Sequence, residues 1–353
     1  MAIPTTCIGA YPKPDYVPLR DWFTVDHGMT DAGAQVTHGY SATMAQATAE
    51  TEALLVRGTR QAIEDQVAAG IDVPTDGEIR RENYIHYHCR HLDGFDFANL
   101  TRRSLRDGAY ETDLPTIVGP VAPKGGHFLT VDYRVAQGFT SRPVKITVPG
   151  PVTIMDTVAN RHYCDDRALA FDLAGAINHE VRALAAAGCA CIQVDEPLFA
   201  RKVGAALDYG IECLERCFDG VPDEVTRVVH ICCGYPNRLD DRDYHKADQE
   251  SYFRLARALD AAAIDQVSIE DAHRHNDLTL LDEFRDKTVV LGVVAVARSR
   301  VESVEEVAMR LTEALDHIDR SRLVAGPDCG LGLLGLRLAR AKLAVLCEAA
   351  RSV

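Results

Sequence analysis

The stretch LAFDLAGAINHEVRALAAAGCACIQVDEP, residues 169–197, contains a helix, a turn and a strand in direct succession. Apolar residues recur at helical spacing up to Ala187, and Gly188 then offers the left-handed conformation that commonly ends a helix. The run 191–194 is short and mostly apolar on both faces, which is typical of a buried parallel strand. It ends in Asp195, followed by Glu196 and Pro197. The stretch predicts one repeat of a parallel α/β fold.

The same alternation runs through the chain. Strand-like runs are expected at 5–9, 71–75, 144–148, 191–194, 227–231, 266–269, 288–294 and 323–325. Helices are expected at 42–69, ending before Gly70, and at 169–187, 252–263, 304–318 and 336–350. Eight strands alternating with helices predict an α/β fold of the (β/α)8 TIM barrel type, as a single domain over residues 1–353. A doubly wound open sheet is the alternative, weakened because no GxGxxG follows the first strand.

The segment from about 94 to 143 fits this alternation less well, because it is rich in glycine, proline and charge. We expect it to be an insertion between the second and third strands, with a hairpin near 118–133. A lid and a contact between copies in a homo-oligomer are both open as its role.

Composition narrows the class of protein. The chain is 47% hydrophobic, and its formal net charge of −14 argues against general nucleic-acid binding. The sequence shows neither a signal peptide nor a membrane span. Its 11 cysteines form no regular disulfide framework. We therefore expect a cytoplasmic protein with reduced thiols, and no nucleic-acid or membrane partner.

The expected strand ends hold a set of metal-ligating residues. His230 and Cys232 are two residues apart in one strand, so their side chains point to the same side. That pair alone is weak evidence in a chain with 13 histidines and 11 cysteines. Glu270 and Cys329, at the ends of two later strands, complete a plausible tetrahedral zinc shell. The competing interpretation is that His230 is a buried histidine and that the two cysteines are ordinary core residues. Cys233 points away from this set, and we expect it to pack in the core.

Such a shell predicts thiol chemistry. The four residues are spread from 230 to 329, which suits a catalytic rather than a structural zinc. Zinc lowers the pKa of a bound thiol, so that the thiolate exists at neutral pH. Glu270 is the hardest of the four ligands, and we expect it to yield its position to the substrate.

Several segments together resemble the catalytic barrel of cobalamin-independent methionine synthase, over nearly the whole chain. They are TTCIGAYP (5–12), DGE (76–78) with REN (81–83), GPVTI (150–154), QVDEP (193–197), and GPDCG (326–330). The resemblance implies that His230, Cys232, Glu270 and Cys329 are zinc ligands. It also implies that Glu78 and Asp195 hold the amino group of homocysteine, and that the turn Ile8, Gly9 and Ala10 holds its carboxylate. A salt-bridge network at the barrel rim is the competing interpretation of Glu78 and Asp195.

Other segments depart from that family. A tryptophan that stacks the folate there is replaced here by Met155-Asp156-Thr157, and a histidine linked to proton delivery is absent from 295–300. The full-length enzymes of the family are also about twice as long. These departures disfavour methyltetrahydrofolate as the methyl donor.

Two kinds of shorter relative keep the zinc-thiolate chemistry. One is a core methionine synthase that takes methyl from another carrier, such as a corrinoid. The other is epoxyalkane:coenzyme M transferase, in which a thiolate opens an epoxide and a proton donor is needed. The candidate donors are His273, His275, Tyr84, His86 and His88.

The sequence therefore predicts a zinc-dependent thiol alkyltransferase whose partners are a small thiol, homocysteine or coenzyme M, and an alkyl donor. A sulfonate-bearing thiol would need a basic partner, either Arg81 or Arg298. A lyase on a related barrel and a non-catalytic zinc module are the remaining alternatives. The four-ligand set argues against the lyase, which needs no zinc. The wide spacing of the ligands along the chain argues against the non-catalytic zinc module.

Overall fold

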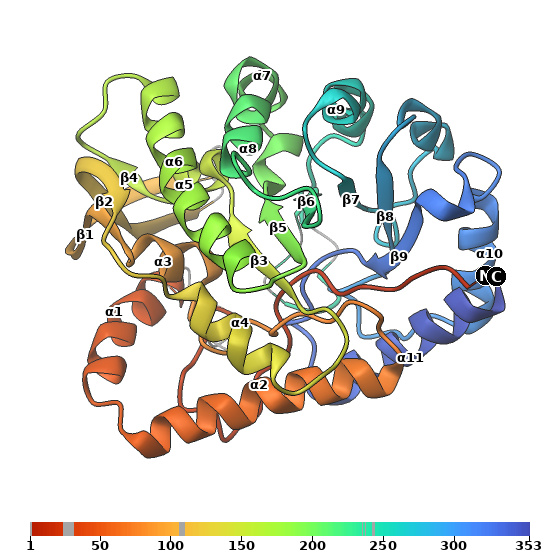
Figure 1. The fold of residues 1–353 in the computed structure, drawn as a ribbon, viewed down its shortest axis with the longest axis horizontal. Helices are drawn as coiled ribbons and strands as arrows, with labels where there is room; N and C mark the ends of the chain where they lie inside the picture. The colour runs from red at the N-terminus through yellow and green to blue at the C-terminus, as the bar shows by residue number, and fades with distance from the viewer. Residues whose placement is uncertain (1, 24–31, 106–109, 235, 237, 242–243) are drawn as a thin grey trace.

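The computed structural model describes residues 2–23, 32–105, 110–234, 236, 238–241 and 244–353. Its centre is a parallel six-stranded sheet with the strands in chain order (Figure 1). These strands are β3 (Lys145–Pro149), β5 (Cys191–Asp195), β6 (Thr226–Ile231), β7 (Gln266–Glu270), β8 (Thr288–Val294) and β9 (Leu323–Pro327). The predicted α/β class and parallel sheet are confirmed.

Two further segments close this sheet into a ring. Thr5 pairs with Ala325 of β9, Thr6 pairs with Val73, and Thr75 pairs with Lys145 of β3, all in parallel. The predicted first and second strands therefore occupy their expected places, but they pair through single-residue bridges rather than long ladders. The eight segments together give the ring of a TIM barrel.

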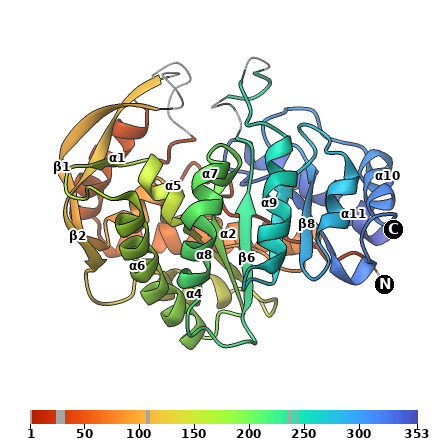
Figure 2. The same cartoon turned by 90° about the horizontal axis from the view of Figure 1, so that it is seen from above.

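Helices surround the ring in both views (Figures 1 and 2). The longer ones are α1 (Ala32–Ala45), α2 (Ala49–Ala69), α6 (Asp166–Ala186), α9 (Glu250–Ala261), α10 (Val304–Ala314) and α11 (Leu336–Ser352). The shorter ones are α3 (Tyr84–Cys89), α4 (Leu129–Gln137), α5 (Pro151–Asp156), α7 (Val203–Ala205) and α8 (Ile211–Cys217). No helix among the described residues is long and apolar enough to cross a membrane.

The predicted helix at 42–69 is wrong in one respect, since the chain breaks it into α1 and α2. Thr48 adopts an extended conformation, and its side chain accepts a hydrogen bond from the backbone N–H of Thr51 in a capping box. A threonine at that position starts a new helix because it satisfies a donor that the first turn leaves free. The end of α2 is as predicted, with Gly70 in the left-handed conformation at φ 113°.

A second, three-stranded sheet lies beside the barrel. The antiparallel strands β1 (Leu92–Leu105) and β2 (Tyr110–Pro123) form it together with the short β4 (Ala159–Asn160). The hairpin predicted near 118–133 is therefore misplaced. Gly125 and Gly126 do make a turn, with φ of 85° and 74°, but that turn leads from β2 into α4. The extent of the insertion stays a prediction.

Candidate metal centre

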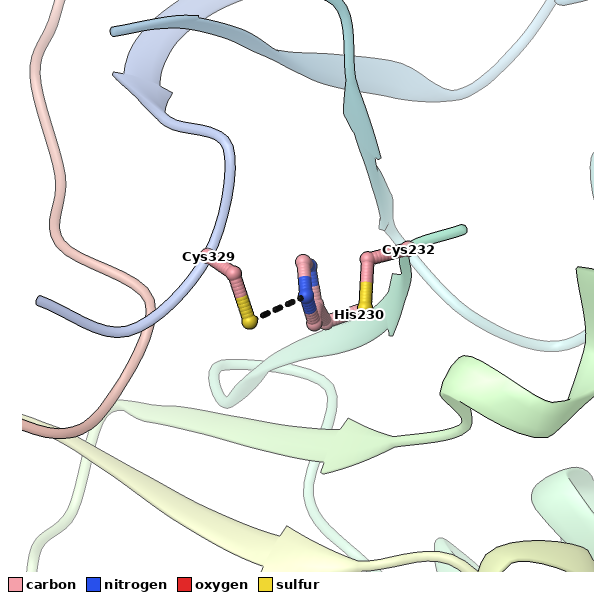
Figure 3. Close-up of side chains that lie close together, drawn as sticks. All are labelled: His230, Cys232 and Cys329. Atoms are coloured by element: carbon pink, nitrogen blue, oxygen red, sulfur yellow. Dashed lines mark hydrogen bonds between the residues drawn. The ribbon is translucent and has the colours of Figure 1, made fainter. Parts of the chain in front are cut away.

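Three of the four predicted zinc ligands meet at the mouth of the barrel (Figure 3). His230 lies on β6, Cys232 follows that strand, and Cys329 follows β9. His230 Nε2 lies 3.2 Å from Cys329 Sγ, and the ligand atoms of all three residues lie within 4.8 Å of one another. Two sulfurs and an imidazole nitrogen at these distances fit the donor set of zinc.

The neighbouring strand fixes the orientation of the imidazole. His230 pairs with Ser268 of β7, and the Ser268 hydroxyl lies 2.9 Å from His230 Nδ1. That contact occupies one ring nitrogen and leaves the other directed at Cys329. Partners of this kind around a metal-binding histidine set its tautomer and its ring position.

The electrostatics of the cluster favour a thiolate. The Cys329 thiol beside it, and then His230, hold the pKa of Cys232 well below its usual range, although burial opposes this. Burial would lower the pKa of His230, but the adjacent Cys232 and Asp195 raise it. A negative sulfur next to an imidazole is the charge arrangement that binds a divalent cation.

Glu270, the fourth predicted ligand, ends β7 close by but is directed elsewhere. Its Oε1 lies 2.6 Å from Lys246 Nζ, and its Oε2 accepts a hydrogen bond from the backbone N–H of Cys233 at 3.0 Å. Sequence reasoning missed Lys246, because it is a single lysine in an irregular segment and no pattern marks it. Lys246 also donates to the Gly234 carbonyl at 2.7 Å, so it joins that segment to the Glu270 carboxylate.

The predicted substrate-binding residues form a second group at the ends of the first, second and fourth strand positions. Gln193 Nε2 donates both to the Ile8 carbonyl at 2.9 Å and to Asp195 Oδ1 at 2.7 Å. Glu78 Oε1 accepts a hydrogen bond from the Thr147 hydroxyl at 2.8 Å. A Cβ added at Gly9 would lie 2.6 Å from the same oxygen, so only glycine allows this close approach.

The backbone at Glu78 has an unusual conformation. Its φ is 57°, in the left-handed region that disfavours side chains other than glycine. Such a residue costs on the order of 1–3 kcal/mol and is found disproportionately at functional sites. The conformation aims the carboxylate at Thr147 and Gly9, in the interior of the barrel.

Burial also changes the acidity of both carboxyls. Loss of water raises the pKa of Glu78 to about 7, with Arg81 opposing the shift and Asp76 and Asp195 adding to it. Burial likewise raises the pKa of Asp195 to about 6. Two acidic groups with raised pKa values in one polar site are typical of a binding or catalytic centre.

Arg81 braces this group from within the protein. Its guanidinium donates to the Thr147 carbonyl at 2.9 Å and lies 3.3 Å from Asp76 Oδ2 and 3.6 Å from Glu78 Oε1. The side chain is only 2% exposed, so the guanidinium interacts with protein groups rather than with bulk water.

Tyr84, the first residue of α3, is close enough to both the cysteines of the metal cluster and the Glu78–Asp195 pair for their charges to affect its pKa. Its pKa is raised well above the usual range, first by burial and then by four nearby acidic groups: Asp195, Cys232, Cys329 and Glu78. The phenol therefore stays protonated at neutral pH. Both the thiols and the carboxyls therefore interact electrostatically with the Tyr84 phenol.

The predicted catalytic histidines lie in other surroundings. His273 Nδ1 lies 2.5 Å from Asp328 Oδ2, and its Nε2 accepts a hydrogen bond from the Ala297 N–H at 3.0 Å. Both ring nitrogens are thus engaged with protein groups. The side chain of His275 is 65% exposed, and its Nδ1 lies 3.2 Å from Asp271 Oδ2.

The other proton-donor and sulfonate-binding candidates also lie apart from the cluster. His86 Nδ1 lies 2.7 Å from the Thr37 hydroxyl. His88 is buried, and burial lowers its pKa to about 3, so it is neutral at physiological pH. Arg298 is exposed and donates to the His273 carbonyl at 2.7 Å.

Comparisons with known proteins agree with this geometry. The family profile described as "Cobalamin-independent synthase, Catalytic domain" matches residues 3–352. A methionine synthase of Saccharolobus islandicus is 30% identical over 99% of this chain and 95% of its own length. A methionine synthase of Sulfolobus acidocaldarius is 30% identical over 97% of this chain and 89% of its own. The structure of a B12-independent methionine synthase from Shewanella sp. W3-18-1, in complex with selenomethionine, has a TM-score of 0.84 at 30% identity, covering 99% of this chain and 97% of that one.

Proposed function

Because the chain belongs to the family of the cobalamin-independent synthase catalytic domain and is a methyltransferase related to methionine synthase, we propose that it methylates homocysteine in a zinc-dependent reaction. The observation that carries the proposal is the convergence of His230, Cys232 and Cys329 beside Asp195, which pairs with His230 across the sheet and is near Glu78. The relatives of similar length argue that one barrel of this size is sufficient for a methionine synthase.

Three residues, His230, Cys232 and Cys329, would hold the zinc ion. When bound there, zinc would lower the pKa of a coordinating thiol and so supply a thiolate nucleophile at neutral pH. Three protein ligands leave a fourth position for substrate, which is typical of catalytic zinc sites. We propose Glu270 as the exchangeable ligand, since Lys246 already offers its carboxylate an alternative partner at 2.6 Å.

The chain's own residues recognise the amino-acid end of the substrate in this proposal. Glu78 and Asp195 accept hydrogen bonds from the ammonium group, and the backbone of Ile8, Gly9 and Ala10 faces the carboxylate. The buried Arg81 guanidinium favours the ionised form of Glu78, which is the form that binds a cation. The selenomethionine bound to the Shewanella relative is an amino acid of the product type, and it favours homocysteine over coenzyme M as acceptor.

We propose that the methyl donor is a carrier other than methyltetrahydrofolate. The stretch after GPVTI is Met155-Asp156-Thr157, where the resemblance would place an aromatic residue to stack the folate. Among the predicted proton donors, Tyr84 is the one whose environment reaches both the thiols and the carboxyls. We therefore assign Tyr84, rather than His273, as the proton donor to the group that leaves the methyl carbon when the sulfur is methylated.

Calorimetry with the zinc-loaded protein tests the acceptor. Homocysteine is expected to bind and to release a proton as its thiol is deprotonated, whereas coenzyme M, which lacks an ammonium group, is expected to bind weakly. Tight binding of coenzyme M without binding of homocysteine would instead indicate the epoxyalkane:coenzyme M transferase alternative.

Metal analysis tests the zinc assignment. Cys329→Ser is expected to lose the zinc bound at the barrel mouth together with methyltransferase activity. Cys164→Ser is the matched control, because Cys164 is an exposed free thiol outside the cluster, and this variant should keep both. An active, zinc-free wild-type protein would overturn the proposal.

A further inference from the structure

A second cluster of metal-ligating side chains lies on a helix outside the barrel mouth. It consists of His179 and Glu180 on α6 and His127, which lies between β2 and α4. One ligand atom from each residue lies within 4.8 Å of the other two. We infer that these three residues form a binding site for a divalent transition-metal ion, independent of the proposed zinc centre.

The contacts within the cluster bring the donors to ligating distances. Glu180 is buried, and its Oε1 lies 3.1 Å from His127 Nδ1. The two imidazole rings stack with their centroids 4.4 Å apart and their planes at 29°. Two imidazoles and a carboxylate are a frequent ligand set for zinc and related ions.

An unsatisfied nitrogen points to a ligand independently of the cluster's shape. His179 Nε2 is buried and has no hydrogen-bond partner among the described residues. Buried polar atoms are normally satisfied, so an exception calls for an unseen ion or water. A cavity of about 470 Å³ lies at the cluster, and its lining includes His127, His179, Asn178 and Arg182, so there is room for water to complete the coordination.

In the proposed centre at the barrel mouth, as in this cluster, two ligand atoms lie at hydrogen-bonding distance from each other. There, His230 Nε2 lies 3.2 Å from Cys329 Sγ, as His127 Nδ1 lies 3.1 Å from Glu180 Oε1. In both places a hydrogen bond joins two ligand atoms that a metal ion would separate only slightly. The second site has no sulfur, so it prefers ions that accept nitrogen and oxygen ligands, such as Zn²⁺, Co²⁺ and Ni²⁺.

The position of the cluster indicates a structural consequence. Glu180 Oε2 also accepts a hydrogen bond from the N–H of Leu129, the first residue of α4, at 3.3 Å. A metal ion held by His127 and Glu180 would therefore fasten the start of α4 to α6. His127 follows β2 in the chain, and β2 packs against α6. The ion would therefore add a link between the three-stranded sheet and this barrel helix.

Cobalt(II) titration of the full chain distinguishes the two sites. Cobalt bound to thiolates gives a sulfur-to-metal charge-transfer band, whereas cobalt bound to nitrogen and oxygen gives only weak d–d bands. The wild-type protein is expected to bind two equivalents, one with each signature. His179→Ala should lose the d–d signal of the sulfur-free site and keep the charge-transfer band, and His162→Ala, which changes an exposed histidine elsewhere, should lose neither.

A double variant, Cys232→Ser with Cys329→Ser, isolates the second site from the first. It should still bind one equivalent of cobalt, and adding His179→Ala should abolish that binding. Circular dichroism checks that each variant is folded. A wild-type stoichiometry of one, or a sulfur-free signal that survives His179→Ala, would overturn the inference without affecting the proposed function. A wild-type protein that shows the weak d–d bands but no charge-transfer band would count against the proposed zinc centre only.

Discussion

Replacing Glu78 by glutamine removes one of the two carboxylates that we propose bind the substrate ammonium. Glutamine has nearly the same size, and its carbonyl can still accept the hydrogen bond that Thr147 donates to Glu78 at 2.8 Å. The variant therefore tests charge rather than packing. A hydrogen bond to a charged group contributes about 1.5–3 kcal/mol, so the affinity for methionine should fall by about tenfold to about 150-fold.

The pH dependence of binding gives a sharper test. With a pKa of about 7, Glu78 is only about 9% ionised at pH 6 but about 76% ionised at pH 7.5. Because the ionised form binds the ammonium, wild-type affinity should fall about eightfold between pH 7.5 and pH 6. Asp195, with a pKa of about 6, should add a further factor of about two. In Glu78→Gln only that smaller factor should remain.

Calorimetry with methionine measures this effect without interference from the thiol. Methionine carries the same ammonium and carboxylate groups as homocysteine, but its thioether has no proton to lose. Glu64→Gln is the control, since Glu64 is an exposed carboxylate that pairs with Arg60 on α2. Equal affinity of the wild-type protein at pH 6 and 7.5, or unchanged affinity of Glu78→Gln at pH 7.5, would refute the assignment.

Three other substitutions test separate parts of the structure. Lys246→Met removes the competitor for the Glu270 carboxylate and should raise zinc affinity by about tenfold in chelator competition; unchanged affinity would argue that Glu270 is not a ligand. Gly9→Ala places a Cβ 2.6 Å from the Glu78 carboxylate and should weaken methionine binding with little loss of stability, and a normal dissociation constant would contradict this. Ser303→Ala removes the N-cap of α10 and should lower the free energy of unfolding by about 1 kcal/mol in urea titration, without changing activity.

Strand positions and the side of the sheet that a residue faces are readily predicted from this sequence. Short, mostly apolar runs indicated β5 and β8, and the two-residue spacing of His230 and Cys232 placed both side chains at the barrel mouth. This succeeded because the alternation of side chains along a strand is a local property of the backbone. The meeting of Cys329 with His230 followed from the ring, since strand ends of one ring share one rim.

Contacts made by irregular segments were not predictable in the same way. The reach of Lys246 to Glu270 depends on the path of a loop, and a one-residue change in that path would break the contact. The break between α1 and α2 depended on Thr48, whose cap competes with the helical pattern that surrounds it. Gly125 and Gly126 signalled a turn correctly but carried no information on whether a strand or a helix follows.

The ring of strands is hydrogen-bonded unevenly around its circumference. From β3 to β9 each neighbouring pair is joined over four or five residue pairs, whereas the segments at 5–6 and 73–75 are joined by single bridges. Amides in these two segments should therefore exchange with deuterium earlier than those of β5 or β7. The segments lead directly into Gly9 and Glu78, while His230 lies on a well-paired strand and Cys329 follows another. We therefore expect the zinc-binding residues and Asp195 to be ordered before substrate binds, and the turn at Gly9 and Glu78 to be ordered further by the bound amino acid.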